Sequence, residues 1–196
     1  MGFFTHNARI AGTVAMGLLR RRRTNPPAGL NMHIYKARAG LLDLDGYLHM
    51  NNAAYLTHAE LARWNWFAYS GLLGFVARRK LLFLVTNSAI TYRAPIGPWK
   101  PFDVTTEICG WDERSITLRH NFVVKSGRRA AQNLVSARIM DGATGELLAP
   151  GPVLAEIGVP STVREQSPAE EAALARFAEL NAALRETTSS RRDPPP

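Results

Sequence analysis

Residues 43–55 read DLDGYLHMNNAAY and run directly into a segment with helical periodicity. From Asn52 to about Ser70, apolar side chains recur at steps of four and three residues, which places them on one face of a helix. The residues of this face are Tyr55, Ala59, Ala62, Trp66 and Tyr69. Asn51 or Asn52 can cap the start of the helix, and Gly71 can end it. The sequence therefore predicts one long amphipathic helix that begins immediately after a polar loop.

Segments that alternate apolar and polar side chains predict a β-sheet around this helix. Residues 31–39 predict a first strand, and residues 82–93 predict a long second one. Three further segments, at 102–109, 116–124 and 130–140, follow one another across turns, which is typical of an antiparallel meander with one covered face. The helix must bury its apolar face, and the sheet offers the only large apolar surface. We therefore predict an α+β fold in which an antiparallel sheet wraps around one long central helix.

Charge is distributed unevenly along the chain. The net charge is +8, yet seven basic residues and no acidic residue precede Asp43, whereas the remainder has 17 basic and 16 acidic residues. A nearly neutral body argues against a nucleic-acid groove. An N-terminus with arginines and no acids suits a mitochondrial presequence or a membrane-surface helix, and a disordered basic tail is the alternative. We expect a mitochondrial or membrane-associated protein, and otherwise a cytoplasmic one.

Breaker residues and a second helical segment divide the chain. Asn25-Pro26-Pro27-Ala28-Gly29 separates the N-terminal segment from the folded body, and residues 168–186 predict a C-terminal helix with Ser167 as its cap. The expected divisions are a basic N-terminal tail or targeting segment at 1–29, a central domain at 30–160, and the C-terminal helix with a disordered tail at 161–196. The single cysteine, Cys109, excludes a disulfide within the chain. No metal-binding spacing or phosphate-binding glycine motif appears, so we expect neither a metal nor a bound cofactor.

The polar loop combines two elements that thioester hydrolysis requires. A helix N-terminus presents unpaired backbone N–H groups and a partial positive charge, which can polarise a carbonyl group and hold a developing oxyanion. A carboxylate in the same loop can attack the carbonyl carbon or deprotonate a water molecule. The same residue types also suit a purely structural role, because aspartate and asparagine often cap turns and helices.

The loop resembles the D-x-D-x-x-x-H-x-N-N-x-x-Y signature of hotdog-fold thioesterases of the 4-hydroxybenzoyl-CoA and acyl-carrier-protein thioesterase type, and in particular the thioesterase superfamily member 6 group of eukaryotic proteins. The resemblance covers about residues 30–158. It includes Glu60 and Arg63, Tyr92-Arg93-Ala94-Pro95, the Phe102 to Thr106 strand and Trp111-Asp112. It implies a hotdog fold, a role in lipid metabolism, and a homodimer or tetramer that holds an acyl-CoA or acyl-carrier thioester between subunits. CoA would then be part of the substrate.

The resemblance also implies roles for the acidic and histidine side chains of the loop. Asp45 stands four residues before the signature histidine, where the family has its catalytic carboxylate, so it is the expected general base or nucleophile. Its alternative role is to cap a turn or the helix. His49 is expected to orient Asp45 or to bind substrate, and a packing role is the alternative. Asp43 is expected to be structural.

Three residues in and near the start of the helix complete the candidate catalytic set. Asn51 and Asn52 are expected to position water or substrate, although capping the helix explains one of them without further assumption. Glu60 is a candidate second carboxylate, because some hotdog thioesterases use an acid on the helix. Its alternative role is an ion pair with Arg63, three residues further along the helix.

These observations leave three functional interpretations. The first is a hydrolase that releases a carboxylic acid from a thioester, and the intact Asp45 and His49 favour it. The second is a non-catalytic hotdog module that binds acyl-CoA or a protein partner, also at a membrane through the basic tail. Leu48 favours the second, because the family often has glycine directly before the signature histidine and leucine adopts glycine conformations less readily. A hotdog dehydratase is the third and weakest.

Overall fold

The computed structural model describes residues 2–24, 32–159 and 165–189. The chain divides into two compact units, Met1–Thr162 and Val163–Pro196. The first unit holds all the strands and the candidate site. No helix within the described residues is long and apolar enough to cross a membrane.

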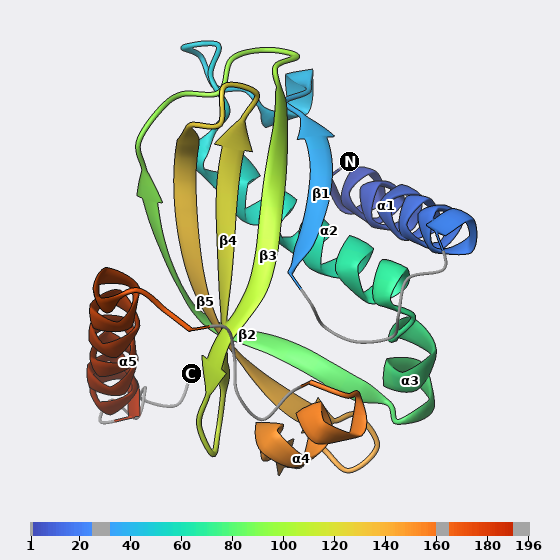
Figure 1. The fold of residues 1–196 in the computed structure, drawn as a ribbon, viewed down its shortest axis with the longest axis vertical. Coiled ribbons are helices and arrows are strands. Elements are labelled where there is room, and N and C mark those ends of the chain that lie inside the picture. Colours follow the sequence, from blue (N-terminus) through green and yellow to red (C-terminus); the bar gives the residue numbers. More distant parts are fainter. Residues whose placement is uncertain (1, 25–31, 160–164, 190–196) are drawn as a thin grey trace, which may run out of the picture. The chain divides into compact units, whose positions relative to one another are not determined.

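The first unit is one antiparallel sheet with helices packed against it. Its elements in chain order are α1 (Gly2–Thr24), β1 (His33–Arg38), a 3₁₀ turn (Leu41–Asp43), α2 (Asn52–Ser70), α3 (Leu73–Arg78), β2 (Leu81–Tyr92), β3 (Pro101–Trp111), β4 (Ile116–Val124), β5 (Arg129–Asp141), β6 (Leu147–Leu148) and α4 (Pro150–Glu156). The strand order is β1-β3-β4-β5-β2, and β6 pairs with β5. Helix α2 lies behind the sheet in Figure 1. This is the hotdog fold, so the predicted α+β architecture with one long central helix is confirmed.

Local capping chemistry sets both ends of the central helix. The side chain of Asn51 accepts a hydrogen bond from the backbone N–H of Ala53 at 2.8 Å, and Gly71 ends the helix with φ of 82°. The face predicted to be apolar packs against the sheet. Tyr55 is 2% exposed, and its ring makes an edge contact with Phe122 of β4 at 5.0 Å between centroids. The central helix therefore has the predicted limits and the predicted buried face.

The N-terminal segment forms a helix that packs on α2, as Figure 1 shows. Residues 2–24 of the range assigned to a tail or targeting segment make up α1. The two helices touch closely at Gly17, where an added Cβ would lie 2.7 Å from the Cβ of Ala68. The side-chain amide of Asn65 donates to the carbonyl oxygen of Thr13 at 2.9 Å. This segment is therefore part of the first compact unit, and its targeting or membrane role stays a prediction.

The remaining elements follow the sequence with few exceptions. The second unit contains α5 (Pro168–Ser189), which begins at the predicted residue. Ser167 caps it, since the Glu170 N–H donates to the Ser167 hydroxyl oxygen and the Ser167 N–H donates to the Glu170 carboxylate. Helix α4 and the two-residue strand β6 were not predicted, because neither is long enough to show a period. The tail predicted at the C-terminal end lies mostly outside the described residues.

Asp43 connects the first helix, the polar loop and the central helix. Its Oδ1 accepts from the Arg9 guanidinium of α1 at 2.9 Å. Its Oδ2 lies 3.1 Å from Nε2 of His58 on α2 and accepts from the Gly40 N–H at 2.9 Å. Burial by itself raises the pKa of Asp43, but the bonds from His58 and Gly40 and the charge of Arg9 together lower it to about 2. The structural role expected for Asp43 therefore agrees with its buried position.

We predict that Asp43→Asn lowers the free energy of unfolding by about 2 to 4 kcal/mol at pH 7, because Arg9 and His58 lose their charged partner. The contribution of Asp43 is full above its unfolded pKa of about 4 and is lost as the pH falls toward 2. Denaturant unfolding at several pH values measures this contribution. The difference in the free energy of unfolding between wild type and Asp43→Asn should become smaller below about pH 4. Asp103→Asn, in a half-buried position of β3, is the matched control. An unfolding curve of Asp43→Asn that matches the control would contradict the anchoring role.

Candidate active site

Asp45 shapes the loop that carries it. Its Oδ1 accepts hydrogen bonds from the backbone N–H groups of Tyr47 at 2.9 Å and His49 at 3.2 Å. Its backbone N–H donates to the His49 carbonyl at 2.9 Å, and its carbonyl accepts from the Leu48 N–H at 3.1 Å. Its Oδ2 has no hydrogen bond to any of the described residues. Asp45 therefore uses one carboxylate oxygen to hold the turn and keeps the other for a ligand or water.

Asp45 lines a shallow hollow of about 290 Å³ between the start of α2 and the end of β2. The residues around it include Asp45, His49, Asn52, Tyr55, Tyr92 and Arg93. Three of the five predicted catalytic residues, Asp45, His49 and Asn52, are thus brought together. The hollow has carboxylate, imidazole, amide and guanidinium groups in one place, which is the composition of a polar reaction site.

The two asparagines have different positions. Asn51 caps α2 and is committed to the Ala53 N–H, as the capping alternative predicted. Asn52 is the first residue of α2 and lines the hollow, and its carbonyl accepts from the Tyr92 hydroxyl at 3.3 Å. Burial raises the pKa of Tyr92, and burial with the neighbouring Tyr92 raises that of Tyr55 to about 12. Both phenols therefore stay protonated and neutral at pH 7.

Most backbone donors of the loop are already bonded. Besides Leu48 and His49, the Met50 N–H donates to the Ile96 carbonyl at 2.8 Å and the Asn51 N–H donates to the Asp43 carbonyl at 2.7 Å. The N–H of Asn52 stands at the first helical position, where no acceptor exists within the helix. It is therefore the backbone donor of the helix N-terminus that remains for a ligand oxygen.

Glu60 lies apart from the hollow. Its carboxylate lies 3.1 Å from Nε2 of His6 on α1, and no ion pair with Arg63, its alternative role, is present among the described residues. Arg63 bonds Nε2 of His120 on β4 at 3.1 Å. The reason is long-range packing, because α1 approaches one side of α2 and the sheet approaches the other. Within one chain Glu60 does not meet Asp45, and its catalytic role stays a prediction.

The family model of the Thioesterase-like superfamily matches residues 39–184 of this chain. The chain belongs to this superfamily. Curated relatives include Protein THEM6 of Danio rerio, which is 34% identical over 119 residues, covering 59% of this chain and 57% of that protein. The Long-chain acyl-CoA thioesterase FadM of Escherichia coli is 40% identical over 52 residues, covering 26% of this chain and 39% of that protein. The chain spans about half the length of the THEM6 relatives that it matches.

Solved structures of other proteins share the fold. The probable thioesterase YbaW of Escherichia coli has a TM-score of 0.60 and 26% identity, covering 64% of this chain and 96% of that chain. The protein SAV2348 of Staphylococcus aureus, solved in complex with CoA, has a TM-score of 0.58 and 16% identity, covering 73% of this chain and 93% of that chain. The predicted membership of the hotdog thioesterase superfamily is therefore confirmed.

The signature assigns no role to two further residues that line the hollow of this superfamily member. Tyr92 and Arg93 enter the hollow from the end of β2, forty residues after the loop. Tyr92 packs its ring edge-on against Tyr55 at 5.1 Å between centroids. In the sequence, this segment stands out only because Tyr92-Arg93-Ala94-Pro95 resembles the family. The resemblance does not indicate that the sheet brings the segment to the start of α2.

Leu48 adopts the left-handed conformation that favours glycine, with φ of 57°. Its side chain is 64% exposed, so it gains little from packing. We predict that Leu48→Gly raises the free energy of unfolding by about 0.5 to 1 kcal/mol, because the steric penalty of a Cβ in this conformation disappears. Denaturant unfolding checks the value. Leu48→Ala keeps the Cβ and is the control, and equal stability of the two variants would contradict the interpretation.

Proposed function

We propose that this protein hydrolyses acyl-CoA thioesters and releases a carboxylic acid and a free thiol. The observation that carries the proposal is Asp45, which lines the hollow and whose Oδ1 is held by two backbone N–H groups while its Oδ2 has no hydrogen bond to the described residues. A carboxylate fixed in this way has one oxygen available as a general base or nucleophile. Membership of the Thioesterase-like superfamily and the similarity to FadM support the thioester as the substrate class.

The proposed reaction needs only groups at the hollow. Asp45 takes a proton from a water molecule, whose oxygen attacks the carbonyl carbon of the thioester. The tetrahedral oxyanion is stabilised by the Asn52 N–H and the positive end of α2. The oxyanion then collapses, the C–S bond breaks, and the departing CoA thiolate takes up the proton held by Asp45. In the nucleophilic variant, Asp45 itself attacks the carbonyl, the CoA thiolate leaves, and water hydrolyses the resulting anhydride. His49 and Asn52 position the substrate or the water in both variants.

A hydrolysis assay tests this proposal. We expect the purified protein to release CoA thiol from one or more members of a panel of aliphatic and aromatic acyl-CoAs. Asp45→Asn should reduce the rate constant by about 100-fold or more, since the amide cannot accept the proton. Tyr47→Ala, in the same loop but 85% exposed, is the control and should keep full activity. A well-folded protein that hydrolyses no thioester would overturn the proposal.

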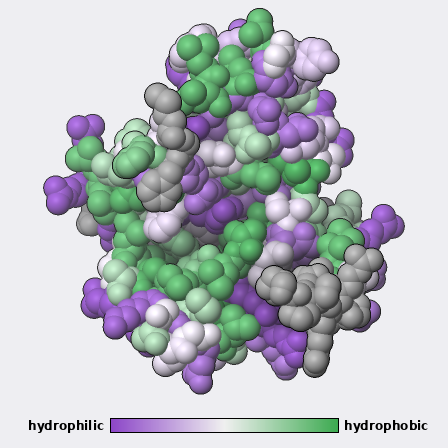
Figure 2. All heavy atoms as spheres, turned by 180° about the vertical axis from the view of Figure 1, so that it is seen from behind, coloured by the Kyte–Doolittle hydropathy of each residue, from purple (hydrophilic) through white to green (hydrophobic). Residues whose placement is uncertain are grey.

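We also propose a homo-oligomer. Among the described residues, strand β2 pairs with β5 on one side only, which leaves an edge available for another strand. It exposes Leu82, Leu84 and Val85, each at least 40% accessible. The molecule seen from behind has a broad apolar area (Figure 2). An apolar edge strand of this kind is a common surface for assembly.

Light scattering in solution should therefore give a mass of at least twice 21.6 kDa. Val85→Lys should shift the protein toward the monomer, because a charge on the edge strand opposes pairing. Leu147→Lys places the same charge on the exposed strand β6 and should leave the mass unchanged. A wild-type monomer at micromolar concentration would contradict the proposal.

A non-catalytic module at a membrane is the second candidate, and the solvent face of α1 favours it. Phe4, Met16 and Leu19 are each more than half exposed on this helix, and its last turn carries Arg21, Arg22 and Arg23. Apolar side chains beside arginines suit the surface of an anionic membrane. The hydrolysis assay separates the two candidates, since a module of this kind binds the thioester and leaves it intact.

A further inference from the structure

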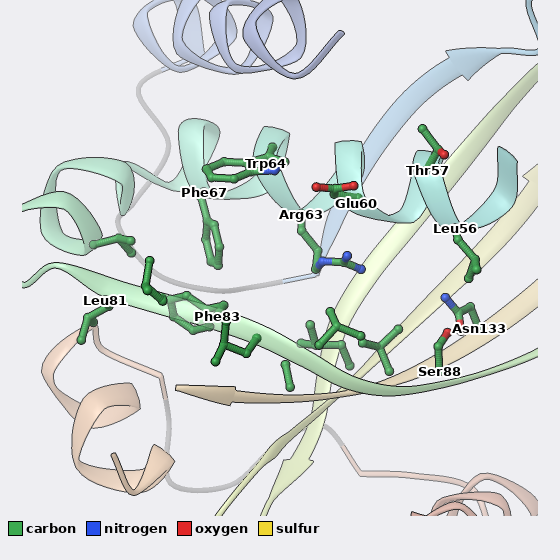
Figure 3. Close-up of a pocket in the computed structure, with 17 residues that line it drawn as sticks. Leu56, Thr57, Glu60, Arg63, Trp64, Phe67, Leu81, Phe83, Ser88 and Asn133 are labelled. Atoms are coloured by element: carbon green, nitrogen blue, oxygen red, sulfur yellow. Dashed lines mark hydrogen bonds between the residues drawn. The ribbon is translucent and has the colours of Figure 1, made fainter. Parts of the chain in front are cut away.

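Strand β1 stands at the edge of the sheet opposite β2. The β2 edge borders a cavity of about 570 Å³ between α2 and the sheet (Figure 3), and it is the edge of the proposed homo-oligomer. A second copy at β2 therefore leaves the β1 edge open. Strand β1 ends beside the start of β3, where Arg38 pairs with Pro101 (Figure 1). We call the surface around this point, residues 36–42 and 97–103, the β1–β3 end.

Three large apolar side chains project into solvent at the β1–β3 end. Leu41 is 69% exposed, Leu42 79% and Trp99 59%. The two leucines lie in the 3₁₀ turn after β1, and the tryptophan lies in the turn before β3. The two turns are joined, because the Trp99 N–H donates to the Ala39 carbonyl at 2.8 Å. The β1–β3 end therefore carries an exposed apolar patch that two connected turns build together.

The backbone holds these side chains outward. Asp43 ends the 3₁₀ turn and is 3% exposed, and its carboxylate accepts hydrogen bonds from Arg9 and from the Gly40 N–H. The turn therefore cannot rotate to bury its leucines without breaking these bonds. Trp99 has a φ of 57°, a left-handed conformation that is unfavourable for a residue with a Cβ. Large apolar side chains that a fixed backbone keeps together in water mark an interaction surface.

A basic groove lies at the same end of the sheet. Its volume is about 750 Å³, and its lining includes the exposed cations Lys36, Arg38 and Lys125. Asp103 adds one half-buried carboxylate, which leaves the groove with an excess of positive charge. A fourth exposed cation, Lys100, stands in the turn before β3. The charge around the apolar patch is therefore complementary to an anionic surface.

This combination favours a lipid surface over a folded protein or a soluble anion. A folded partner needs a complementary pocket for each projecting side chain, whereas a lipid layer deforms around them. A soluble anion would engage the cations and leave the three apolar side chains in water. Tryptophan is enriched at membrane interfaces, because its ring is apolar and its N–H is polar. Lysine and arginine beside such side chains are attracted to anionic headgroups.

We propose that the β1–β3 end docks the protein on the surface of an anionic phospholipid membrane. The three exposed apolar side chains of the two turns enter the boundary of the acyl layer, and the four cations around them meet lipid phosphates. Asp45 stands two residues after the 3₁₀ turn, so docking holds the hollow close to the membrane surface. This surface is separate from the solvent face of α1, and docking requires no hydrolysis.

Co-sedimentation of the full chain with lipid vesicles tests the proposal. Vesicles of phosphatidylcholine with phosphatidylserine provide the anionic surface, and vesicles of phosphatidylcholine alone are the comparison. We expect the protein to prefer the anionic vesicles and to bind them less tightly as the salt concentration rises. The double variant Leu41→Gln/Leu42→Gln should lower the partition coefficient at least about tenfold, because two apolar side chains are lost without a change in charge. An unchanged partition coefficient would overturn the proposal.

The matched control makes the same two substitutions on α1. Met16 is 54% exposed and Leu19 is 53% exposed, so Met16→Gln/Leu19→Gln also removes two apolar side chains from the surface. This control should bind anionic vesicles as tightly as the wild type. Loss of binding in the control, with binding retained in the leucine variant of the 3₁₀ turn, would place the membrane contact on α1 and refute the proposal.

A charge variant guards against effects on folding. Lys100→Gln should weaken binding to the anionic vesicles about fivefold, as expected for one cation at an anionic surface, and should not change binding to phosphatidylcholine. It decides the matter if circular dichroism shows that the leucine variant does not fold. Poly-glutamate that binds wild type and leucine variant equally, and as tightly as the vesicles, would indicate an acidic partner instead. Since no thioester is present, the result is independent of whether the protein hydrolyses acyl-CoA.

Discussion

The buried carboxylate of Asp43 holds the candidate active site in place. It joins Arg9 of α1, His58 of α2 and the Gly40 N–H at the end of the first strand, while its own carbonyl accepts from the N–H of Asn51. Three segments that are distant in sequence are thereby joined at Asp43, which stands two residues before Asp45. Removing one charge from such a buried cluster leaves its partners uncompensated, so the position of the loop depends on the whole set.

This fixation leaves few free groups at the loop, and these define what the site can do. The N–H groups of residues 48–51 are all bonded inside the protein, whereas Oδ2 of Asp45 and the N–H of Asn52 have no hydrogen-bond partner among the described residues, and both residues line the hollow. The hollow lies between the start of α2 and the end of β2.

The sequence predicts elements whose signals are local. The central helix has the predicted ends, because the Asn51 cap and the Gly71 terminus are decided by neighbouring residues. Helix α1 shows no clear helical periodicity in the sequence. Its outer face carries apolar side chains as well as the face that packs on α2, so apolar and polar residues do not separate onto two faces. The signature indicated Asp45, His49 and Asn52 as a group. The partners of Glu60 and Arg63 lie on α1 and on β4, and only the tertiary fold brings these elements against α2.

The central claim is that a thioester reacts beside Asp45. The most direct test is a crystal structure of Asp45→Asn with an acyl-CoA substrate, which this variant is expected to leave intact. The account predicts that the thioester carbonyl carbon lies in the hollow, with the side chain of residue 45 or a water molecule bound to it about 3 to 3.5 Å away. The Asn52 N–H should point at the carbonyl oxygen. A thioester bound elsewhere, with the hollow filled only by solvent, would contradict the account.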